Sequence, residues 1–376
     1  MIPTFRWTLP VLLVSSLLTA QSAAWAAPLK VGLAFDLGGK NDGSFNQSAL
    51  AGAQRAARTF DIQLSSFSPV DSGGVIARGA EPLVRGGAEL VIGVGFSNKD
   101  DVQKSAVSHA GVKFAVVDDL PSGPNTVGLR FREHEGSFMV GYIAAKTSST
   151  GIIGFVGGQD VPLIHKFEAG YTAGVKLACP SCKVVSAYVG KTPTAWNDPA
   201  TARKLAAGMQ QAGADVIFAA AGASGTGVMA QANESQCLKA AQLPKGVSFK
   251  TDLFAAVPKS AAYQKACAGG QTRPVFFIGV DTNQNALGDD DKNPATLNHG
   301  LTSMVKRVDN VVYSLIRDVA MKRTWADGDQ SYGLENGGVG YAVDEYNRAL
   351  ISKSLQDRLD KIQHLIVIRG IKVPTE

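Results

Sequence analysis

The sequence predicts an α/β protein made of two doubly wound lobes. Apolar runs of strand length alternate with Ala-rich helical patterns along the 376 residues, which exceed one ordinary domain. Residues 212–222 also repeat the pattern of residues 86–95, since both predict a helix end, a tight turn, a buried strand and a glycine loop. The same repetition would also arise if two unrelated segments had independently acquired a common α/β pattern. No Pro-, Ser- or Gly-rich linker separates the halves, so ordered crossover strands are expected between the lobes.

Each element follows from its pattern. Runs rich in Val, Ile, Leu and Phe predict strands at 29–36, 62–67, 90–94, 114–118, 126–129, 152–156, 183–189, 216–221, 275–280 and 301–305. Ala-rich periodic segments predict helices at 47–59, 76–86, 135–146, 167–178, 200–212 and 307–321. Such alternation favours parallel sheets with helices on both faces, and ligands bind at the carboxyl ends of such strands.

The N-terminus predicts an export signal over residues 1–26. Arg6 precedes an apolar run at 9–18, and Ala24-Trp25-Ala26 has the small-x-small pattern of a cleavage site. The run is too short to span a membrane. No cysteine precedes Cys179 to carry a lipid anchor, so we expect an exported, soluble mature protein.

The charge pattern gives no indication of a nucleic-acid partner. The formal net charge is +5, and the Lys and Arg residues are scattered rather than gathered in a stripe with interleaved aromatic residues.

Four cysteines fit an oxidising compartment. Cys179 and Cys182 have redox-motif spacing, but they lie between a predicted helix and a strand, not at a helix N-terminus that would lower a thiol pKa. Cys237 and Cys267 flank a polar, Lys-rich segment that resembles an insertion. Three pairings are possible; we favour 179–182 with 237–267. No His at ligand spacing supports a zinc site.

The segment after the first strand is the strongest candidate site. The strand ends in Asp36, and a double-glycine turn leads to Phe45 and Asn46 at a helix start. An acceptor, an aromatic face, an amide and backbone N–H groups suit a small polar ring compound. The alternative is that Asp42 and Ser44 merely cap the helix.

Two later segments carry similar features. Asp281 follows the strand at 275–280, so it could share a cleft with Asp36 or cap a helix at 283–287. Trp196 lies in a loop between a strand and a helix, where it could stack on a ring or pack under the loop.

Glycine and lysine positions add to this set. The loop at 221–227 lacks the Lys of a phosphate-binding loop, so Gly222 more simply allows close backbone approach to a ligand. Lys306 ends a strand and could reach a ligand, neutralise a carboxylate or be solvated. The five His residues show no pairing pattern, and no Gly-x-Ser-x-Gly elbow is present, which argues against catalysis and against a cofactor.

Together, several segments resemble the basic membrane protein family, the purine-nucleoside receptors of ABC transporters. The matching segments are 36–46, 131–141, 157–162, 167–174, 196–199, 279–281 and 333–339. The resemblance covers nearly the whole mature chain. It implies a type I periplasmic binding-protein fold with three crossovers between lobe 1 (28–128 and 282–322) and lobe 2 (129–281 and 323–376).

The resemblance also implies roles for residues. Phe45 matches one stacking position, and Trp196 falls at the other, where Phe is common. Asp36, Asn46, Asp281 and Lys306 occupy positions that hold the base edge and ribose. Glu135 falls near another acidic contact, for which Asp119 is the alternative, and Gly222 matches the close backbone approach.

The implied function is that of a non-catalytic, monomeric periplasmic receptor. It would bind a purine nucleoside such as inosine, guanosine or adenosine, close on it, and dock on an inner-membrane ABC permease. Two departures are the missing lipid-attachment cysteine and the long segment between Cys237 and Cys267. The alternatives are an exported nucleoside hydrolase, or a receptor for another small solute acting in sensing.

Overall fold

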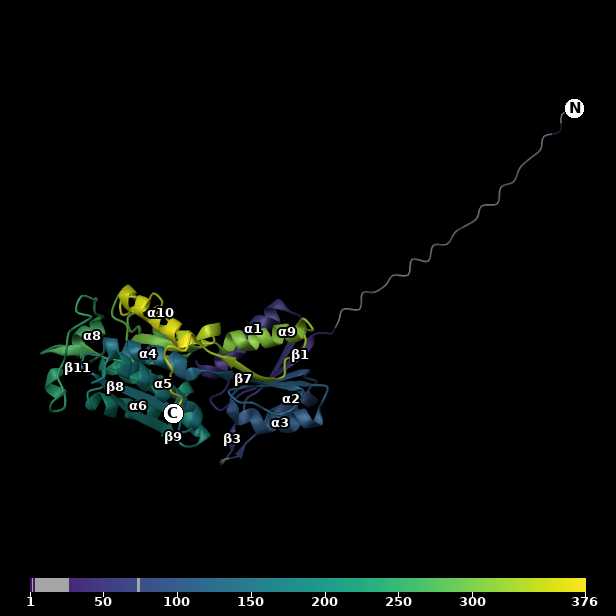
Figure 1. Ribbon diagram of the computed structural model, residues 1–376, viewed down its shortest axis with the longest axis horizontal. Coiled ribbons are helices and arrows are strands. Elements are labelled where there is room, and N and C mark those ends of the chain that lie inside the picture. The colour runs from purple at the N-terminus through teal and green to yellow at the C-terminus, as the bar shows by residue number, and fades with distance from the viewer. Residues whose placement is uncertain (2, 4–26, 73–74) are drawn as a thin grey trace.

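The computed structural model describes residues 1, 3, 27–72 and 75–376. The predicted export signal lies almost entirely outside them. The chain forms two lobes side by side along the long axis of the molecule, each built on a six-stranded sheet (Figure 1). Within the described residues, no helix combines the length and apolar character needed to cross a membrane.

Lobe 1 contains a parallel sheet of order β15-β7-β6-β5-β1-β2. Its strands are β1 (Leu29–Ala34), β2 (Ile62–Phe67), β5 (Leu90–Gly93), β6 (Lys113–Val117), β7 (Thr126–Phe131) and β15 (Gly328–Tyr332). Helices α1 (Phe45–Thr59) and α9 (Val308–Ala320) cover one face, and α2 (Ala80–Arg85) and α3 (Lys99–Ser108) cover the other (Figure 1).

Lobe 2 contains a sheet of order β16-β14-β13-β10-β8-β9, parallel except for β16. Its strands are β8 (Ile152–Gln159), β9 (Lys183–Gly190), β10 (Val216–Ala220), β13 (Phe276–Asp281), β14 (Gly300–Lys306) and β16 (Val339–Tyr341). The main helices are α4 (Glu133–Thr147), α5 (Pro162–Ala178), α6 (Pro199–Gln211), α7 (Gly225–Ser235) and α10 (Lys353–Val367).

The predicted strands and most predicted helices are confirmed to within a few residues. The central strands β5, β10 and β13 are buried along their whole length, which explains their continuous apolar runs. One hydrophobic cluster includes residues of both lobes, among them Phe131, Phe167 and Val280. This shared core lies beside the place where the two lobes meet.

The predicted helix at 76–86 is shorter in the structure. Residues Val75–Ile76 form β4, which pairs with β3 (Asp71–Ser72), and α2 begins only at Ala80.

The chain passes between the lobes three times: after β7, after β14 and after β15. The sheets differ from the predicted lobe boundaries. The prediction assigns 282–322 to lobe 1, yet β14 pairs with β13 in lobe 2. It assigns the residues of β15 to lobe 2, yet this strand pairs with β7 in lobe 1. Sheet membership is set by pairing between segments distant in sequence, which the pattern within one strand does not encode.

Both favoured disulfides, Cys179–Cys182 and Cys237–Cys267, are present. The second closes the Lys-rich segment, which contains α8 (Ala261–Ala266). This segment begins in β11 (Cys237–Lys239), which pairs antiparallel with β12 (Thr272–Pro274), the strand that follows Cys267. The segment is therefore a small stapled extension of lobe 2.

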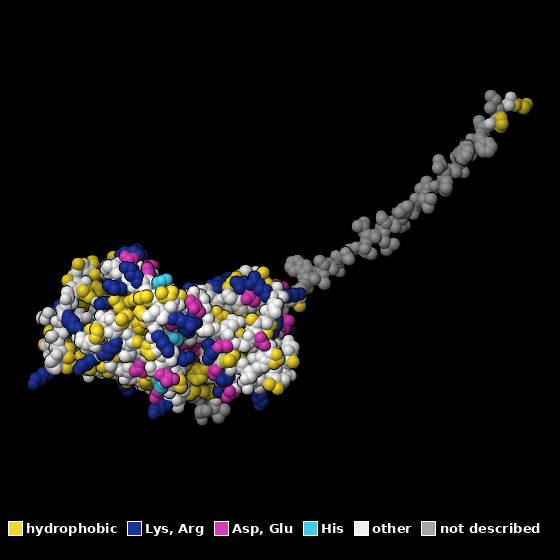
Figure 2. All heavy atoms as spheres, in the orientation of Figure 1, with side chains coloured by type: hydrophobic (Ala, Val, Ile, Leu, Met, Phe, Trp, Pro, Cys, Tyr) yellow, Lys and Arg dark blue, Asp and Glu magenta, His cyan; other side chains and the backbone are white. Residues whose placement is uncertain are grey.

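Figure 2 shows Lys and Arg side chains interspersed with Asp and Glu over the visible face. This mixed surface agrees with the scatter of charges in the sequence.

Candidate functional site

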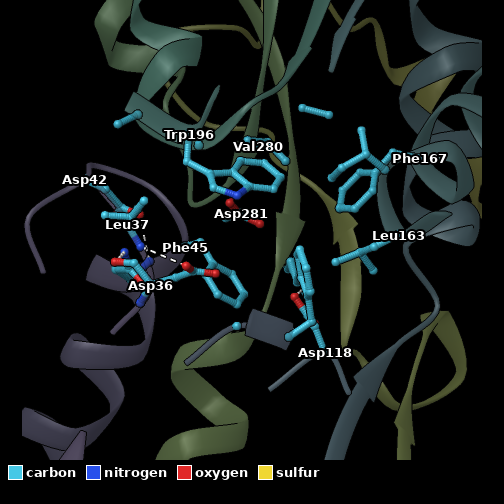
Figure 3. A pocket seen from close by; sticks show the side chains of 18 residues that line it. Asp36, Leu37, Asp42, Phe45, Asp118, Leu163, Phe167, Trp196, Val280 and Asp281 are labelled. Atoms are coloured by element: carbon cyan, nitrogen blue, oxygen red, sulfur yellow. Dashed lines mark hydrogen bonds and ion pairs between the residues drawn. The ribbon is translucent and has the colours of Figure 1, made fainter. Parts of the chain in front are cut away.

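A cavity lies between the lobes, at the carboxyl ends of strands from both sheets. It holds about 570 Å³ of space that no protein atom fills, part of it open to solvent. Its lining residues are Asp36, Leu37, Asp42, Phe45, Asn46, Gly95, Phe96, Asp118, Leu163, Ile164, Phe167, Trp196, Ala220, Gly222, Ala223, Val280, Asp281 and Lys306. Figure 3 shows aromatic and carboxylate side chains converging on this space.

The loop before α1 builds the lobe 1 wall. The Asp42 carboxylate accepts hydrogen bonds from the backbone N–H groups of Ser44, Asn46 and Gln47, so the capping alternative is confirmed for this residue. The Asn46 amide donates to the backbone oxygens of Asp36 (3.2 Å) and Gly39 (3.1 Å). Asn46 therefore fixes the loop from within the cavity wall.

The carboxylate of Asp36 is oriented from two sides. Its Oδ1 accepts from the Leu37 N–H at 2.8 Å and from the Ser97 hydroxyl at 2.9 Å. Burial raises the pKa of Asp36, and these hydrogen bonds oppose the rise.

Aromatic rings reach the cavity from both lobes. Phe45 begins α1 in lobe 1, whereas Phe167 and Trp196 come from α5 and from the loop after β9 in lobe 2 (Figure 3). The Trp196 ring lies directly over Gly158, where an added Cβ would be closer to the ring than real contacts allow. The sequence of β8 thus determines where this ring lies.

Lys306 is a buried cation at the junction of the lobes. Its Nζ lies 2.6 Å from Oδ2 of Asp118 and 3.2 Å from Oε1 of Glu133, and all three side chains are almost fully buried. Burial lowers the pKa of Lys306, but the surrounding carboxylates raise it more, so it lies well above its ordinary range. The solvated-lysine alternative is therefore wrong.

Asp118 and Asp281 both have a backbone conformation that is rare for residues other than glycine. Asp118 and Asp281 follow or end strands and have φ of 74° and 64°, a conformation that Asp tolerates better than most residues. Burial raises the pKa of each to about 6, against the opposing charge of Lys306. Oδ1 of Asp118 is buried and has no hydrogen-bond partner among the described residues.

The structure brings seven of the eight predicted ligand-binding residues to the cavity. These are Asp36, Phe45, Asn46, Trp196, Gly222, Asp281 and Lys306. Glu135 does not line it. Its carboxylate lies beside the segments that pass between the lobes after β7 and β15. There it pairs with Arg132 at 2.7 Å and accepts a hydrogen bond from the Leu334 N–H. Asp119, the alternative, pairs with Lys99 at 3.2 Å.

Sequence reasoning missed Asp118, Glu133 and Phe167 as parts of this site. Asp118 ends a predicted strand, as Asp36 does, and Asp281 directly follows one, so the same signal marks all three. Glu133 and Phe167 lie on helices, where an acidic or aromatic residue gives no such signal.

The arrangement suits a flat, polar ligand. Aromatic faces can stack on a ring, and ionised carboxylates accept hydrogen bonds from N–H and O–H donors. Among the described residues, no three His, Cys, Asp or Glu side chains are arranged to hold a metal ion.

The model of a protein family, described as PnrA-like ABC transporter substrate-binding proteins (Bmp), matches residues 29–239. The chain belongs to this family. It is a substrate-binding protein of the ABC-transporter type, and the resemblance to basic membrane proteins is confirmed.

Relatives span nearly the whole chain. The ABC transporter nucleoside-binding protein BmpA of Lactococcus lactis is 29% identical over 93% of this chain and 90% of that protein. The CD4+ T-cell-stimulating antigen of Listeria monocytogenes is 32% identical over 92% of this chain and 87% of that protein.

The fold has solved counterparts. A solute-binding protein of an ABC transporter system from Aeropyrum pernix superposes with a TM-score of 0.70 at 25% identity, over 93% of this chain and 94% of that one. The predicted type I periplasmic binding-protein fold is confirmed.

Proposed function

We propose that this protein binds a purine nucleoside in the cavity between its lobes, closes on it, and delivers it unchanged to an ABC permease in the inner membrane. It acts in the periplasm, as a monomer. The observation that carries the proposal is the combination of stacking faces on both lobes with buried carboxylates around one lysine.

The chemistry matches the two halves of a nucleoside. The base is a flat ring system that stacks between Phe45 and Trp196, and its N–H edge donates to the Asp281 carboxylate. The ribose hydroxyls donate to carboxylates such as Asp118, whose Oδ1 is buried and unpaired among the described residues.

The relatives support this ligand class. BmpA of Lactococcus lactis is named as a nucleoside-binding protein, and the family consists of substrate-binding proteins rather than enzymes.

Mass spectrometry of the ligand released from purified, denatured protein tests the proposal. We expect a purine nucleoside, displaced from the protein by added inosine more readily than by uridine. A different class of solute would overturn the ligand assignment.

Incubation with inosine tests binding against catalysis. Chromatography should return inosine unchanged. Release of hypoxanthine and ribose at a catalytic rate would overturn the receptor function in favour of a hydrolase.

A further inference from the structure

Two loops from different lobes are joined beside the cavity. Ser44, in the lobe 1 loop before α1, donates its hydroxyl to Oδ2 of Asp281 in lobe 2 at 2.6 Å. Thr282 and Gln284, in the lobe 2 loop after β13, donate to the backbone oxygen of Gly43 at 3.1 and 2.9 Å. Three side chains, those of Ser44, Thr282 and Gln284, therefore donate hydrogen bonds across the lobes at one point.

The lobe 1 partner is held in place by its own lobe. The Asp42 carboxylate accepts from the Ser44 N–H at 2.9 Å and from two further N–H groups at the start of α1. Gly43 has φ of +68°, a conformation that glycine adopts readily. The Gly43 carbonyl and the Ser44 hydroxyl are thus presented together on a fixed loop.

The lobe 2 partner is held just as firmly. Oε1 of Gln284 accepts from the Val280 N–H at 2.8 Å, and the Gln284 N–H donates to the Ser303 hydroxyl at 2.9 Å. Each loop is therefore fixed to its own lobe, and these bonds join the two loops where the lobes meet.

None of the three donors lines the cavity. They cannot act by touching a bound ligand, yet one of them is bonded to Asp281, which does line it. We propose that Ser44, Thr282 and Gln284 form a latch that holds the closed lobes together and slows release of the ligand. This inference rests on the proposed function, in which the lobes close on a nucleoside.

The latch has a kinetic signature. A bond made only in the closed form stabilises that form after the ligand has entered, so its loss speeds dissociation and leaves association nearly unchanged. Since Thr282 neither lines the cavity nor makes a side-chain hydrogen bond to Asp281, loss of its hydrogen bond should raise the dissociation rate by the same factor for different purine nucleosides.

The test is a chase of bound tritiated inosine or adenosine with unlabelled nucleoside, using Ser44→Ala and Thr282→Val. Ser44→Ala removes a hydrogen bond to a carboxylate, so we expect the dissociation rate to rise about tenfold or more. Thr282→Val removes a neutral bond and should raise it about two- to tenfold. Faster dissociation from Ser44→Ala could also arise because Asp281 loses a hydrogen bond. Thr282→Val distinguishes the two explanations, because Thr282 makes no hydrogen bond to the Asp281 carboxylate.

Matched controls carry the same substitutions within a single lobe. The Ser48 hydroxyl accepts from the Asp309 N–H, which joins α1 to α9 inside lobe 1. The Thr226 hydroxyl donates to Ala223 inside lobe 2. Ser48→Ala and Thr226→Val should leave the dissociation rate unchanged, even if thermal stability falls.

The outcomes are distinct. Unchanged dissociation from both latch variants, while the wild type retains inosine and far-ultraviolet circular dichroism shows the variants folded, would overturn the latch alone. A factor for Thr282→Val that differs between inosine and adenosine would also overturn it. A wild type that retains no purine nucleoside would overturn the proposed function and the latch together.

Discussion

Lys306 keeps its charge in a buried position because carboxylates surround it. Its ammonium group lies within ion-pair distance of Asp118 and Glu133, and its Nζ is also about 5 Å from the ring centroids of Phe45 (5.0 Å) and Phe131 (4.9 Å). The lysine therefore allows several acidic groups to share a space with little water.

Removing this ammonium should destabilise the fold. Lys306→Met leaves buried carboxylates without their counter-ion, which typically lowers the free energy of unfolding by about 3–5 kcal/mol. Urea unfolding at pH 7.5 measures the loss. Lys99→Met, which breaks a half-exposed pair with Asp119, is the control and should cost less than about 1 kcal/mol.

The free energy of unfolding that Lys306→Met loses should be smaller at acidic pH. The pKa of Asp118 is already raised to about 6 in the folded state, and without Lys306 it should rise further. The folded state then binds more protons than the unfolded state, so the stability of Lys306→Met rises as the pH falls through that pKa. A variant equally destabilised at pH 5 and pH 7.5 would contradict this account of Lys306.

Nucleoside binding should depend on the ionisation of Asp281. An N–H donor on the base prefers the ionised carboxylate, whose pKa is about 6 in the absence of ligand. Affinity for inosine should therefore fall as the pH drops below about 6. Asp281→Asn should weaken binding about ten- to a hundredfold at pH 7.5 and make this dependence shallower, with the part due to Asp118, whose pKa is also raised to about 6, remaining. Calorimetry at pH 5.0 and 7.5 measures both, and an affinity independent of pH would refute the assignment.

At the scale of elements, β8 determines the position of the Trp196 ring. Gly158→Ala places a methyl group where the ring lies, so Trp196 must move. We expect a loss of purine binding comparable to the loss of one stacking contact, about 1–3 kcal/mol. Gly208→Ala is the control, because its added Cβ meets no atom within 4 Å on α6. Unchanged affinity in Gly158→Ala would show that Trp196 does not stack on the ligand.

We expect the Cys237–Cys267 disulfide to contribute to the stability of the fold and not to ligand binding. It closes a loop with a sequence separation of 30, and no residue of that loop lines the cavity. Replacing both cysteines by Ala should lower the free energy of unfolding by roughly 3–4 kcal/mol by the chain-entropy model. Inosine affinity at 25 °C should stay within about twofold; a larger loss would connect the extension to the site.

The elements that could be predicted were those with a local signal. β5 and β13 are continuous apolar runs because both faces of each strand are covered. β15 is polar and lies at a sheet edge, so nothing in its five residues marked it as a strand of lobe 1. Asp36 and Asp281 were found as carboxylates at strand ends. Glu135 was placed by resemblance alone, and the structure uses it at the crossings instead.

At the scale of the whole molecule, the candidate site lies next to the segments by which the chain passes between the lobes. Lys306 precedes the second crossing and Glu133 follows the first, while Asp118 extends from the sheet of lobe 1. The ion pair between Lys306 and Asp118 therefore joins the two lobes at the floor of the cavity. A ligand that contacts these groups contacts both lobes at once, which couples its binding to their closure.

The central claim is that the cavity between the lobes binds a purine nucleoside. Isothermal titration of inosine into protein that has been unfolded and refolded to remove bound ligand tests it most directly. The account predicts saturable heat at one site per chain, strongly reduced in Phe45→Ala and in Asp281→Asn. Absence of heat with inosine, guanosine and adenosine, from protein that is folded by circular dichroism, would contradict it.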